Sequence, residues 1–170
     1  MLAGLDFSAP GLRIVELGPG TGVFTREILA RLAPDGRFIA IERDPVLASA
    51  TRSRWPTVTC VCDSAERLAA ITAEHGGLPI DHIVSGLPFA SLPASTSRAI
   101  MDAIAATLAP QGTFTTFQYV HACGLPPAIT FRREMTARLG NMRREAVVFR
   151  NLPPAFVLRW RKAADGQVRT

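Results

Sequence analysis

A glycine-rich turn between a short strand and a helix constrains the fold of this chain more than any other feature. Residues 13–17 have the composition of a β-strand, and the chain passes from there into a helix over 23–32 through Val15-Glu16-Leu17-Gly18-Pro19-Gly20-Thr21-Gly22. Glycines allow a tight turn and let the backbone approach a ligand closely at the carboxyl end of a strand. The turn therefore predicts an α/β fold with a ligand site at the carboxyl edge of its sheet.

The rest of the chain alternates between strand-like and helix-like segments. Further strands are expected over 38–41, 58–62, 82–84 and 113–118, and helices after Pro45, after Ser64, over 93–108 and over 132–139, with a loop at Pro126-Pro127. Such alternation is typical of a mostly parallel sheet with helices on both faces. Two β-like runs over 144–150 and 155–160 predict a closing antiparallel pair. We therefore expect a Rossmann-like α/β fold with a seven-stranded sheet and an antiparallel C-terminal strand.

Length and composition favour one intracellular domain. The 170 residues predict a single domain over 1–170, and a hydrophobic fraction of 48% is sufficient for a core of that size. No apolar run approaches the roughly 18 residues that span a bilayer, and no signal peptide opens the chain. The three cysteines, an odd number, do not make a disulfide framework. We therefore expect a cytoplasmic location.

The positive charge of the chain is concentrated in its last quarter. Residues 1–131 contain 9 basic and 11 acidic residues, a net charge of −2, whereas residues 132–170 contain 10 basic and 3 acidic residues, a net charge of +7. A solvated basic surface that aids solubility is one explanation. An anionic partner, either phospholipid headgroups or nucleic acid, is the other. Composition alone does not choose between them.

The glycine turn differs from two common nucleotide-binding loops. A NAD fingerprint would need a third glycine at position 23, which is Val23, and a phosphate-binding P-loop would need Gly-Lys-Ser/Thr. A Gly-x-Gly-x-Gly turn preceded by an acidic residue instead resembles motif I of class I S-adenosylmethionine (SAM)-dependent methyltransferases. The resemblance implies that Glu16 lies near the methionine end of SAM. It also implies that the loop binds the cofactor through Gly18, Pro19, Gly20, Thr21 and Gly22, although a turn that only reverses the chain is the alternative.

Acidic residues follow the next two strands. Glu42 ends the second strand about 20 residues after the turn, where a carboxylate can accept hydrogen bonds from two vicinal ribose hydroxyls. An ion pair with Arg43 is the alternative, and Arg43 is itself an expected cofactor contact. Asp63-Ser64 follows the third strand, where the resemblance implies a contact to the adenine amino group. Asp63 also suits the N-terminus of a helix.

The segment after the fourth strand is Ser85-Gly86-Leu87-Pro88-Phe89. Methyltransferases that act on base nitrogens carry Asn or Asp in the position of Gly86, and this side chain accepts a hydrogen bond from the target amine. Gly86 has no such acceptor, which weakens an adenine-methyltransferase interpretation. We expect Ser85, Gly86 and Leu87 to contact the cofactor, and Pro88 and Phe89 to contact the methyl acceptor.

Three segments together narrow the resemblance. Residues 15–25 (VELGPGTGVFT), 84–92 (VSGLPFASL) and 150–157 (RNLPPAFV) resemble bacterial phospholipid N-methyltransferases and, more distantly, rRNA adenine dimethyltransferases. The resemblance runs over nearly the whole chain. It implies a peripheral enzyme of the inner membrane that methylates phosphatidylethanolamine and its mono- and dimethyl forms toward phosphatidylcholine, releases S-adenosylhomocysteine and uses no metal. That family usually has amphipathic N-terminal helices, which we expect to be missing because residues 1–12 alone precede the first strand.

The basic quarter and the end of the fifth strand supply candidates for the acceptor side. Tyr119 is expected to position the cationic headgroup by a cation–π contact, and His121 is a weaker candidate for a general base. A packing tyrosine and a surface histidine are the alternatives. The arginines expected to engage lipid phosphate through their guanidinium groups are Arg132, Arg133, Arg143 and Arg144.

Two other functions remain open from the sequence. An RNA N-methyltransferase acting on rRNA adenine fits the basic quarter and the Leu-Pro-Phe segment, although nucleic acid is the less favoured partner. A SAM-binding domain without turnover fits the expected loss of the N-terminal helices.

Overall fold

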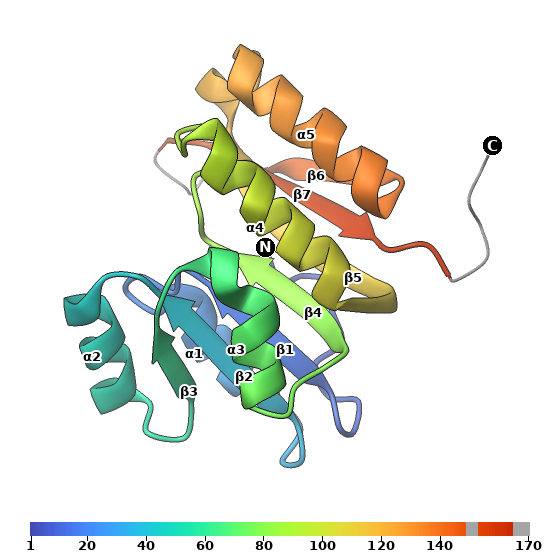
Figure 1. The fold of residues 1–170 in the computed structure, drawn as a ribbon. Coiled ribbons are helices and arrows are strands. Elements are labelled where there is room, and N and C mark those ends of the chain that lie inside the picture. The colour runs from blue at the N-terminus through green and yellow to red at the C-terminus, as the bar shows by residue number, and fades with distance from the viewer. Residues whose placement is uncertain (149–152, 165–170) are drawn as a thin grey trace.

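Seven strands form one sheet in the order β3-β2-β1-β4-β5-β7-β6 (Figure 1). The computed structural model describes residues 1–148 and 153–164. The strands are β1 (Arg13–Leu17), β2 (Arg37–Glu42), β3 (Thr59–Cys62), β4 (Ile80–Ser85), β5 (Leu108–Tyr119), β6 (Met142–Val148) and β7 (Ala155–Arg161). The first five strands run parallel to one another, and β7 runs antiparallel to both β5 and β6. The expected mostly parallel sheet with an antiparallel C-terminal strand is confirmed.

Helices cover both faces of the sheet (Figure 1). They are α1 (Val23–Leu29), α2 (Pro45–Arg54), α3 (Leu68–Glu74), α4 (Ala94–Thr107) and α5 (Pro126–Leu139), with short 3₁₀ turns η1 (Ala65–Arg67) and η2 (Val120–Ala122). On one face, α3, α4 and α5 pack on alternate residues of the central strands, around Phe114 and Trp160. On the other face, α1, α2 and the N-terminal segment enclose a second core around Ile14 and Phe38. Alternating side chains on each strand supply both cores, as a sheet covered on two sides requires.

Several expected boundaries differ from the structure, such as those of the fifth strand, which was expected over 113–118 and spans Leu108–Tyr119, and of the first helix, which was expected over 23–32 and ends at Leu29. Pro126-Pro127, expected in a loop, occupies the first turn of α5, where the missing N–H of proline costs no hydrogen bond and its fixed φ suits a helix. The penultimate strand, expected over 144–150, begins at Met142 and is described as far as Val148, whereas its expected end at residue 150 lies outside the described residues. Arg150, Asn151 and Leu152 of the segment 150–157 lie outside the described residues.

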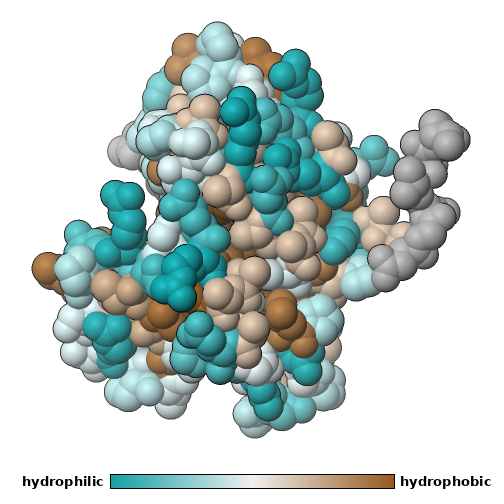
Figure 2. All heavy atoms as spheres, viewed as in Figure 1, coloured by the Kyte–Doolittle hydropathy of each residue, from teal (hydrophilic) through white to brown (hydrophobic). Residues whose placement is uncertain are grey.

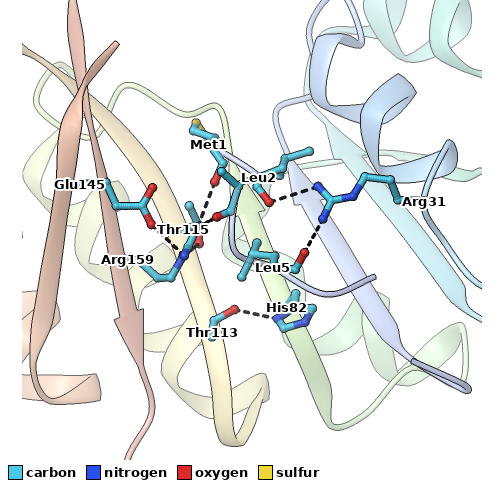
Figure 3. A network of polar contacts seen from close by, with 10 residues as sticks. Met1, Leu2, Leu5, Arg31, His82, Thr113, Thr115, Glu145 and Arg159 are labelled. Atoms are coloured by element: carbon cyan, nitrogen blue, oxygen red, sulfur yellow. Dashed lines mark hydrogen bonds and ion pairs between the residues drawn. The ribbon is translucent and has the colours of Figure 1, made fainter. Parts of the chain in front are cut away.

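The N-terminal segment is held against the sheet by two arginines (Figure 3). Its apolar side chains Leu2, Leu5 and Phe7 are buried in the second core. Arg31 donates hydrogen bonds to the carbonyl oxygens of Leu2 and Leu5. Arg159, on β7, donates to the carbonyl oxygens of Met1 at 3.2 Å and Ala3 at 2.7 Å, and forms an ion pair with Glu145 on β6. The segment therefore closes the sheet face beside β4 and β5.

The surface over α4 and α5 is mixed in character. Polar residues lie along the exposed sides of these helices, and hydrophobic residues gather at the top of the molecule, near the start of α5 (Figure 2). Of the described helices, none is both long enough and apolar enough to cross a bilayer.

Candidate cofactor and acceptor site

The carboxyl ends of four adjacent parallel strands bring the predicted cofactor residues together. Leu17, the last residue of β1, is in register with Ile41 on β2 and with Ser85 on β4. The backbone continues these pairings beyond the strands, because the N–H of Gly18 donates to Ile41 at 2.9 Å and the N–H of Gly86 donates to Leu17 at 2.8 Å. The glycine turn therefore lies between the ends of β2 and β4, at the carboxyl edge where α/β sheets bind ligands.

Two glycines in this region are required by the local geometry. Gly20 has a φ of 55°, in the left-handed region that favours glycine. No atom of the described residues lies within 4 Å of a Cβ built at Gly20, so this part of the turn faces open space. A Cβ at Gly86 would instead lie 2.6 Å from the carbonyl oxygen of Gly18. The two loops thus approach each other through backbone alone and leave room for a ligand at Gly20.

The carboxylate of Glu42 fastens the glycine turn to the end of β2. Its Oε2 atom accepts a hydrogen bond from the Gly20 N–H at 3.1 Å, and its Oε1 atom accepts one from the Asp44 N–H at 3.0 Å. Among the described side chains, no ion pair joins Glu42 to Arg43, whose side chain is exposed. Each carboxylate oxygen keeps a second lone pair. Glu42 can therefore hold the loop and still accept a ribose hydroxyl.

Glu16 is a buried carboxyl group with half of its hydrogen-bonding capacity unused. Its Oε2 atom accepts a hydrogen bond from Thr25 Oγ1 on α1 at 2.6 Å, whereas Oε1 has no partner anywhere in the described part of the chain. Burial raises the pKa of Glu16 to about 7, the hydrogen bonds from Thr25 oppose this shift, and the negative charge of Glu42 adds to it. An unsatisfied buried acceptor beside an open glycine turn fits a ligand that carries positive charge or N–H donors.

Asp63 and Ser64 have clear local structural roles. Asp63 Oδ1 accepts a hydrogen bond from the Ser64 N–H at 2.6 Å, and Oδ2 pairs with Arg67 at 2.7 Å. The Ser64 hydroxyl accepts a hydrogen bond from the Glu66 N–H and caps η1. The Asp63 N–H donates to the Glu42 carbonyl at 3.1 Å, which places both residues beside the cofactor edge. The predicted adenine contact stays a prediction.

The segment after β4 divides between the loop and the core. Ser85 is buried and its hydroxyl accepts a hydrogen bond from the Leu87 N–H at 3.2 Å, while Leu87 packs beside Gly18. Pro88 is exposed. Phe89, expected to face the acceptor, is 5% exposed and stacks on Phe131 with ring centroids 4.3 Å apart. Helix α5 covers the ring and leaves little of it exposed, and the predicted contact of Phe89 with the methyl acceptor stays a prediction.

Tyr119 and His121 are brought together at the end of β5. Tyr119 is half-buried, and its ring lies nearly parallel to that of His121, with centroids 5.6 Å apart and planes at 14°. His121 belongs to η2 and is exposed. The pair forms a partly open aromatic surface at the same edge of the sheet as the glycine turn, because β5 is parallel to β4.

The four candidate arginines are not gathered at one site. Arg132 and Arg144 line one small cavity of about 80 Å³ between α5 and the sheet, together with Gln118, Cys123, Met142, Phe156 and Leu158. Arg143 pairs in register with Arg159, so its side chain projects from the opposite face of the sheet. Arg133 is exposed on α5. Of the four arginines, the structure brings Arg132 and Arg144 together, and the expected phosphate contacts stay predictions.

Three residues support the site without having been predicted from the sequence. Thr25 supplies the hydrogen bond to Glu16 from α1, and Thr116 on β5 donates to the Ser85 carbonyl at 3.1 Å. The side-chain oxygen of Gln118 accepts a hydrogen bond from the Arg132 guanidinium group. Each of the three contacts joins two different elements of the fold. Only the position of Thr25, inside the glycine-turn segment 15–25, was a signal that could have identified any of them.

The residues at the carboxyl edge fit SAM. The open turn at Gly20 leaves space for a ligand, Glu42 offers acceptors for hydroxyls, and the unpaired Oε1 of Glu16 suits the cationic methionine end. Each of these groups lies within one residue of the end of β1 or β2 or within the turn that follows β1. The donor set is one of backbone amides and carboxylates, as a nucleoside with an amino-acid tail requires.

Comparison with known proteins agrees with this geometry. Residues 14–112 match the family model described as a methyltransferase domain. The chain is 38% identical over 104 residues to an ornithine lipid N-methyltransferase of Singulisphaera acidiphila. The aligned region covers 59% of this chain and 54% of the relative, so the match spans about half the length of that protein. It is 44% identical over 52 residues, 31% of this chain and 18% of the relative, to a ribosomal RNA small subunit methyltransferase A of Chlorobium phaeobacteroides.

A solved structure supports the fold. The 16S rRNA N2 G1207 methyltransferase of T. thermophilus, in complex with AdoMet and guanosine, superposes with a TM-score of 0.67 at 19% identity over 92% of this chain and 39% of that one. The family match covers more than half of the sequence. The chain belongs to the methyltransferase domain family and has the class I fold of SAM-dependent methyltransferases.

Proposed function

We propose that this chain is the catalytic domain of a SAM-dependent N-methyltransferase that converts phosphatidylethanolamine, and its mono- and dimethyl forms, toward phosphatidylcholine at the cytoplasmic membrane surface. The observation that carries the proposal is the pairing of a cofactor cradle at Gly20, Glu42 and Glu16 with an acceptor side made of aromatic and arginine side chains. The relative from Singulisphaera acidiphila, a lipid N-methyltransferase by name, supports a lipid amine as the acceptor.

The cofactor side requires little chemistry from the protein beyond orientation. When bound, SAM supplies a methyl group on a sulfonium, and transfer to an amine is an in-line displacement whose rate depends on alignment. Glu42 and the backbone of the glycine turn hold and orient the cofactor. Glu16 stabilises its cationic end, and ionisation of Glu16 is favoured once that positive charge lies nearby.

The acceptor side must hold a cationic headgroup and expose a neutral amine. The nearly parallel rings of Tyr119 and His121 offer an aromatic surface for the ammonium group. The amine becomes a nucleophile after it loses a proton, and in this proposal the exposed imidazole of His121 accepts that proton. Both residues thereby act on the acceptor rather than on the cofactor.

The arginine pair supports a phosphate-bearing acceptor. Arg144 and Arg132 line the same cavity, and the Arg144 guanidinium lies 4.7 Å from the Phe156 ring centroid, which fixes its direction. Guanidinium groups bind phosphate with two hydrogen bonds in a planar arrangement. Leu2, Leu5 and Phe7 are buried, so a membrane contact through the described residues relies on the basic last quarter and on the exposed apolar residues near α5.

Methyl transfer from labelled SAM tests the proposal directly. The chain is incubated with anionic vesicles containing phosphatidylethanolamine, and lipid products are separated by degree of methylation. We expect label in mono- and dimethyl products. A preparation that binds S-adenosylhomocysteine but labels no lipid amine contradicts the proposal and leaves a SAM-binding domain without turnover.

RNA adenine methylation is the second candidate, because the sequence match to the ribosomal RNA methyltransferase of Chlorobium phaeobacteroides favours it. Gly86 argues against this function, since a side-chain acceptor at that position is sterically excluded by the Gly18 carbonyl. Methylated adenine in digests of RNA treated with the protein, together with binding that weakens steeply with salt, would favour RNA over lipid.

A further inference from the structure

A cavity between helices α4 and α5 lies beside the acceptor segment and is separate from the cofactor cradle. It has a volume of about 500 Å³, within the range typical of ligand pockets. Its wall begins at the residues that directly follow Ser85-Gly86-Leu87-Pro88. The apolar part of that wall consists of Phe89, Leu92, Met101, Pro126, Pro127 and Phe131.

The cavity is a groove between the N-terminal parts of α4 and α5, and ion pairs bridge the two helices farther along. The N-terminal ends of α4 and α5 lie toward the same edge as the carboxyl ends of β1, β2 and β4 (Figure 1). Farther along the helices, ion pairs join Arg98 to Glu134 at 3.4 Å and Arg138 to Asp102 at 2.7 Å. From Pro126 to Glu134 helix α5 rises about 12 Å. The groove therefore starts near the acceptor edge and ends where the two helices are bridged.

Exposed apolar side chains lie close to the end of the groove that is nearest the acceptor edge. Leu125 and Ile129, at the start of α5, are 52% and 49% exposed. Exposed apolar residues beside a groove indicate contact with an apolar partner. Arg98, the basic residue of the groove wall, is already paired with Glu134, so the groove offers little to a polyanion such as RNA.

We propose that this groove binds an acyl chain of the lipid acceptor. The inference rests on the proposed function, which supplies the lipid. It adds a binding site for the acyl chain of that lipid. An acyl chain in the groove would leave its headgroup at the carboxyl edge, near the segment after β4. Each methylene that leaves water for an apolar site strengthens binding about fourfold. The groove therefore makes the enzyme discriminate between lipids by chain length.

The first experiment compares lipids that share a headgroup. Single-chain phosphatidylethanolamines with a hexadecanoyl or a hexanoyl chain are methylated in the same detergent micelles, and binding of a fluorescent long-chain fatty acid is measured separately. We expect kcat/KM to favour the hexadecanoyl lipid at least about fifteenfold, which is the effect of two buried methylenes. Equal kcat/KM for the two lipids, together with no binding of the fatty acid, overturns the proposal.

A matched pair of variants on α4 locates the effect. Ala94 lines the groove and Ala99 does not, and both are exposed on the same helix. Ala94→Trp is expected to weaken fatty-acid binding and to reduce the chain-length preference about tenfold, while S-adenosylhomocysteine affinity stays unchanged. Ala99→Trp is expected to match the natural chain in every measurement. Thermal unfolding of both variants checks that they fold alike.

The two readouts separate the groove from the reaction. Fatty-acid binding that Ala94→Trp weakens and Ala99→Trp does not supports the groove even if no lipid amine is methylated, in which case the proposed function has failed alone. Methylation of phosphatidylethanolamine with identical fatty-acid binding by both variants overturns the groove and leaves the function intact.

Discussion

The cofactor half and the acceptor half of this sheet are built on different principles. Around β1, β2 and β4, the site consists of backbone hydrogen bonds, close-packed glycines and two carboxyl groups that are at most 9% exposed. Around β5, β6 and β7, it consists of half-buried or exposed rings and arginines. The charge follows the same division, from −2 over residues 1–131 to +7 over residues 132–170. The first half can recognise one fixed ligand closely, whereas the second suits an acceptor that is anionic and variable in shape.

The sharpest test of the cofactor half is a side chain at Gly20. Gly20→Val is expected to abolish S-adenosylhomocysteine binding, because the valine occupies the open space at the turn. The left-handed φ of 55° adds a backbone cost of about 1–2 kcal/mol to folding. Isothermal titration calorimetry measures the binding and thermal unfolding measures the cost.

Gly11 is the matched control for that variant. It also has a left-handed φ, 66°, and no described atom lies within 4 Å of a Cβ built there. Gly11→Val should therefore lose similar stability and keep full affinity. Normal binding by Gly20→Val would show that the turn does not border the cofactor.

The next largest effect comes from Glu16 and depends on pH. Burial raises its pKa from 4.5 to about 7, so between these values the folded chain holds a proton that the unfolded chain has released. Stability therefore falls as pH rises through this window, by about 3 kcal/mol in total. Glu16→Gln should remove this decline and be the more stable protein at pH 8.

Urea unfolding at pH 5 and pH 8 measures this difference. Glu27→Gln, at an exposed position on α1, should keep the pH dependence of the natural chain. If Glu16→Gln shows the same decline as Glu27→Gln, the unpaired carboxyl is not the source. Added S-adenosylmethionine should reduce the decline, since its positive charge favours the ionised form of Glu16.

A smaller effect is expected at Glu42. Glu42→Ala should weaken S-adenosylhomocysteine binding by about 1–3 kcal/mol, through lost ribose hydrogen bonds and a loosened glycine turn. Glu42→Gln keeps one acceptor oxygen and should lie between the natural chain and the alanine variant. Titration calorimetry of all three proteins gives the order, and an unchanged affinity in Glu42→Ala would mean that this carboxylate has been misassigned.

The same division explains how much could be predicted from the sequence. The turn at Gly18–Gly22 and the acidic residue Glu42 were identified because their positions depend on short segments whose strand ends are adjacent by topology. The burial of the Phe89 ring could not be predicted, because it depends on α5, more than 30 residues later. The separation of the four arginines could not be predicted either, because a register pairing between β6 and β7 decides which face Arg143 occupies. A local motif thus predicts where a loop such as the glycine turn lies in the fold. The exposure and direction of a single side chain depend on tertiary packing, which the motif does not contain.

On the acceptor half, a substitution at Tyr119 tests whether this residue positions the headgroup or only packs against its neighbours. Tyr119→Phe keeps the ring beside His121 but removes the hydroxyl, and we expect turnover to fall by a factor equivalent to about 0.5–1.5 kcal/mol. The affinity for S-adenosylhomocysteine should stay the same, because the ring lies outside the cofactor cradle. Steady-state kinetics with phosphatidylethanolamine measures the loss, and unchanged turnover would assign Tyr119 to packing alone.

The smallest expected effect tests whether the arginine pair reads phosphate or only adds positive charge. Arg144 lines the cavity shared with Arg132, and Arg143, its neighbour in sequence, projects from the opposite face. Both substitutions to alanine remove one charge, so a general attraction to anionic vesicles should weaken equally, by about 1 kcal/mol each. A specific phosphate contact should in addition raise KM for phosphatidylethanolamine in Arg144→Ala alone.

An amino lipid without phosphate completes this comparison. Ornithine lipid offers an amine but no phosphate, so Arg144→Ala should leave its KM close to that of Arg143→Ala. The ratio of the two KM values, phosphatidylethanolamine to ornithine lipid, should therefore rise about fivefold in Arg144→Ala and stay constant in Arg143→Ala. Equal ratios in both variants would mean that the basic half attracts a surface without recognising a headgroup. The difference between the halves would then lie in selectivity. The cofactor half would bind one ligand through specific hydrogen bonds, and the acceptor half would attract anionic lipids through its net positive charge.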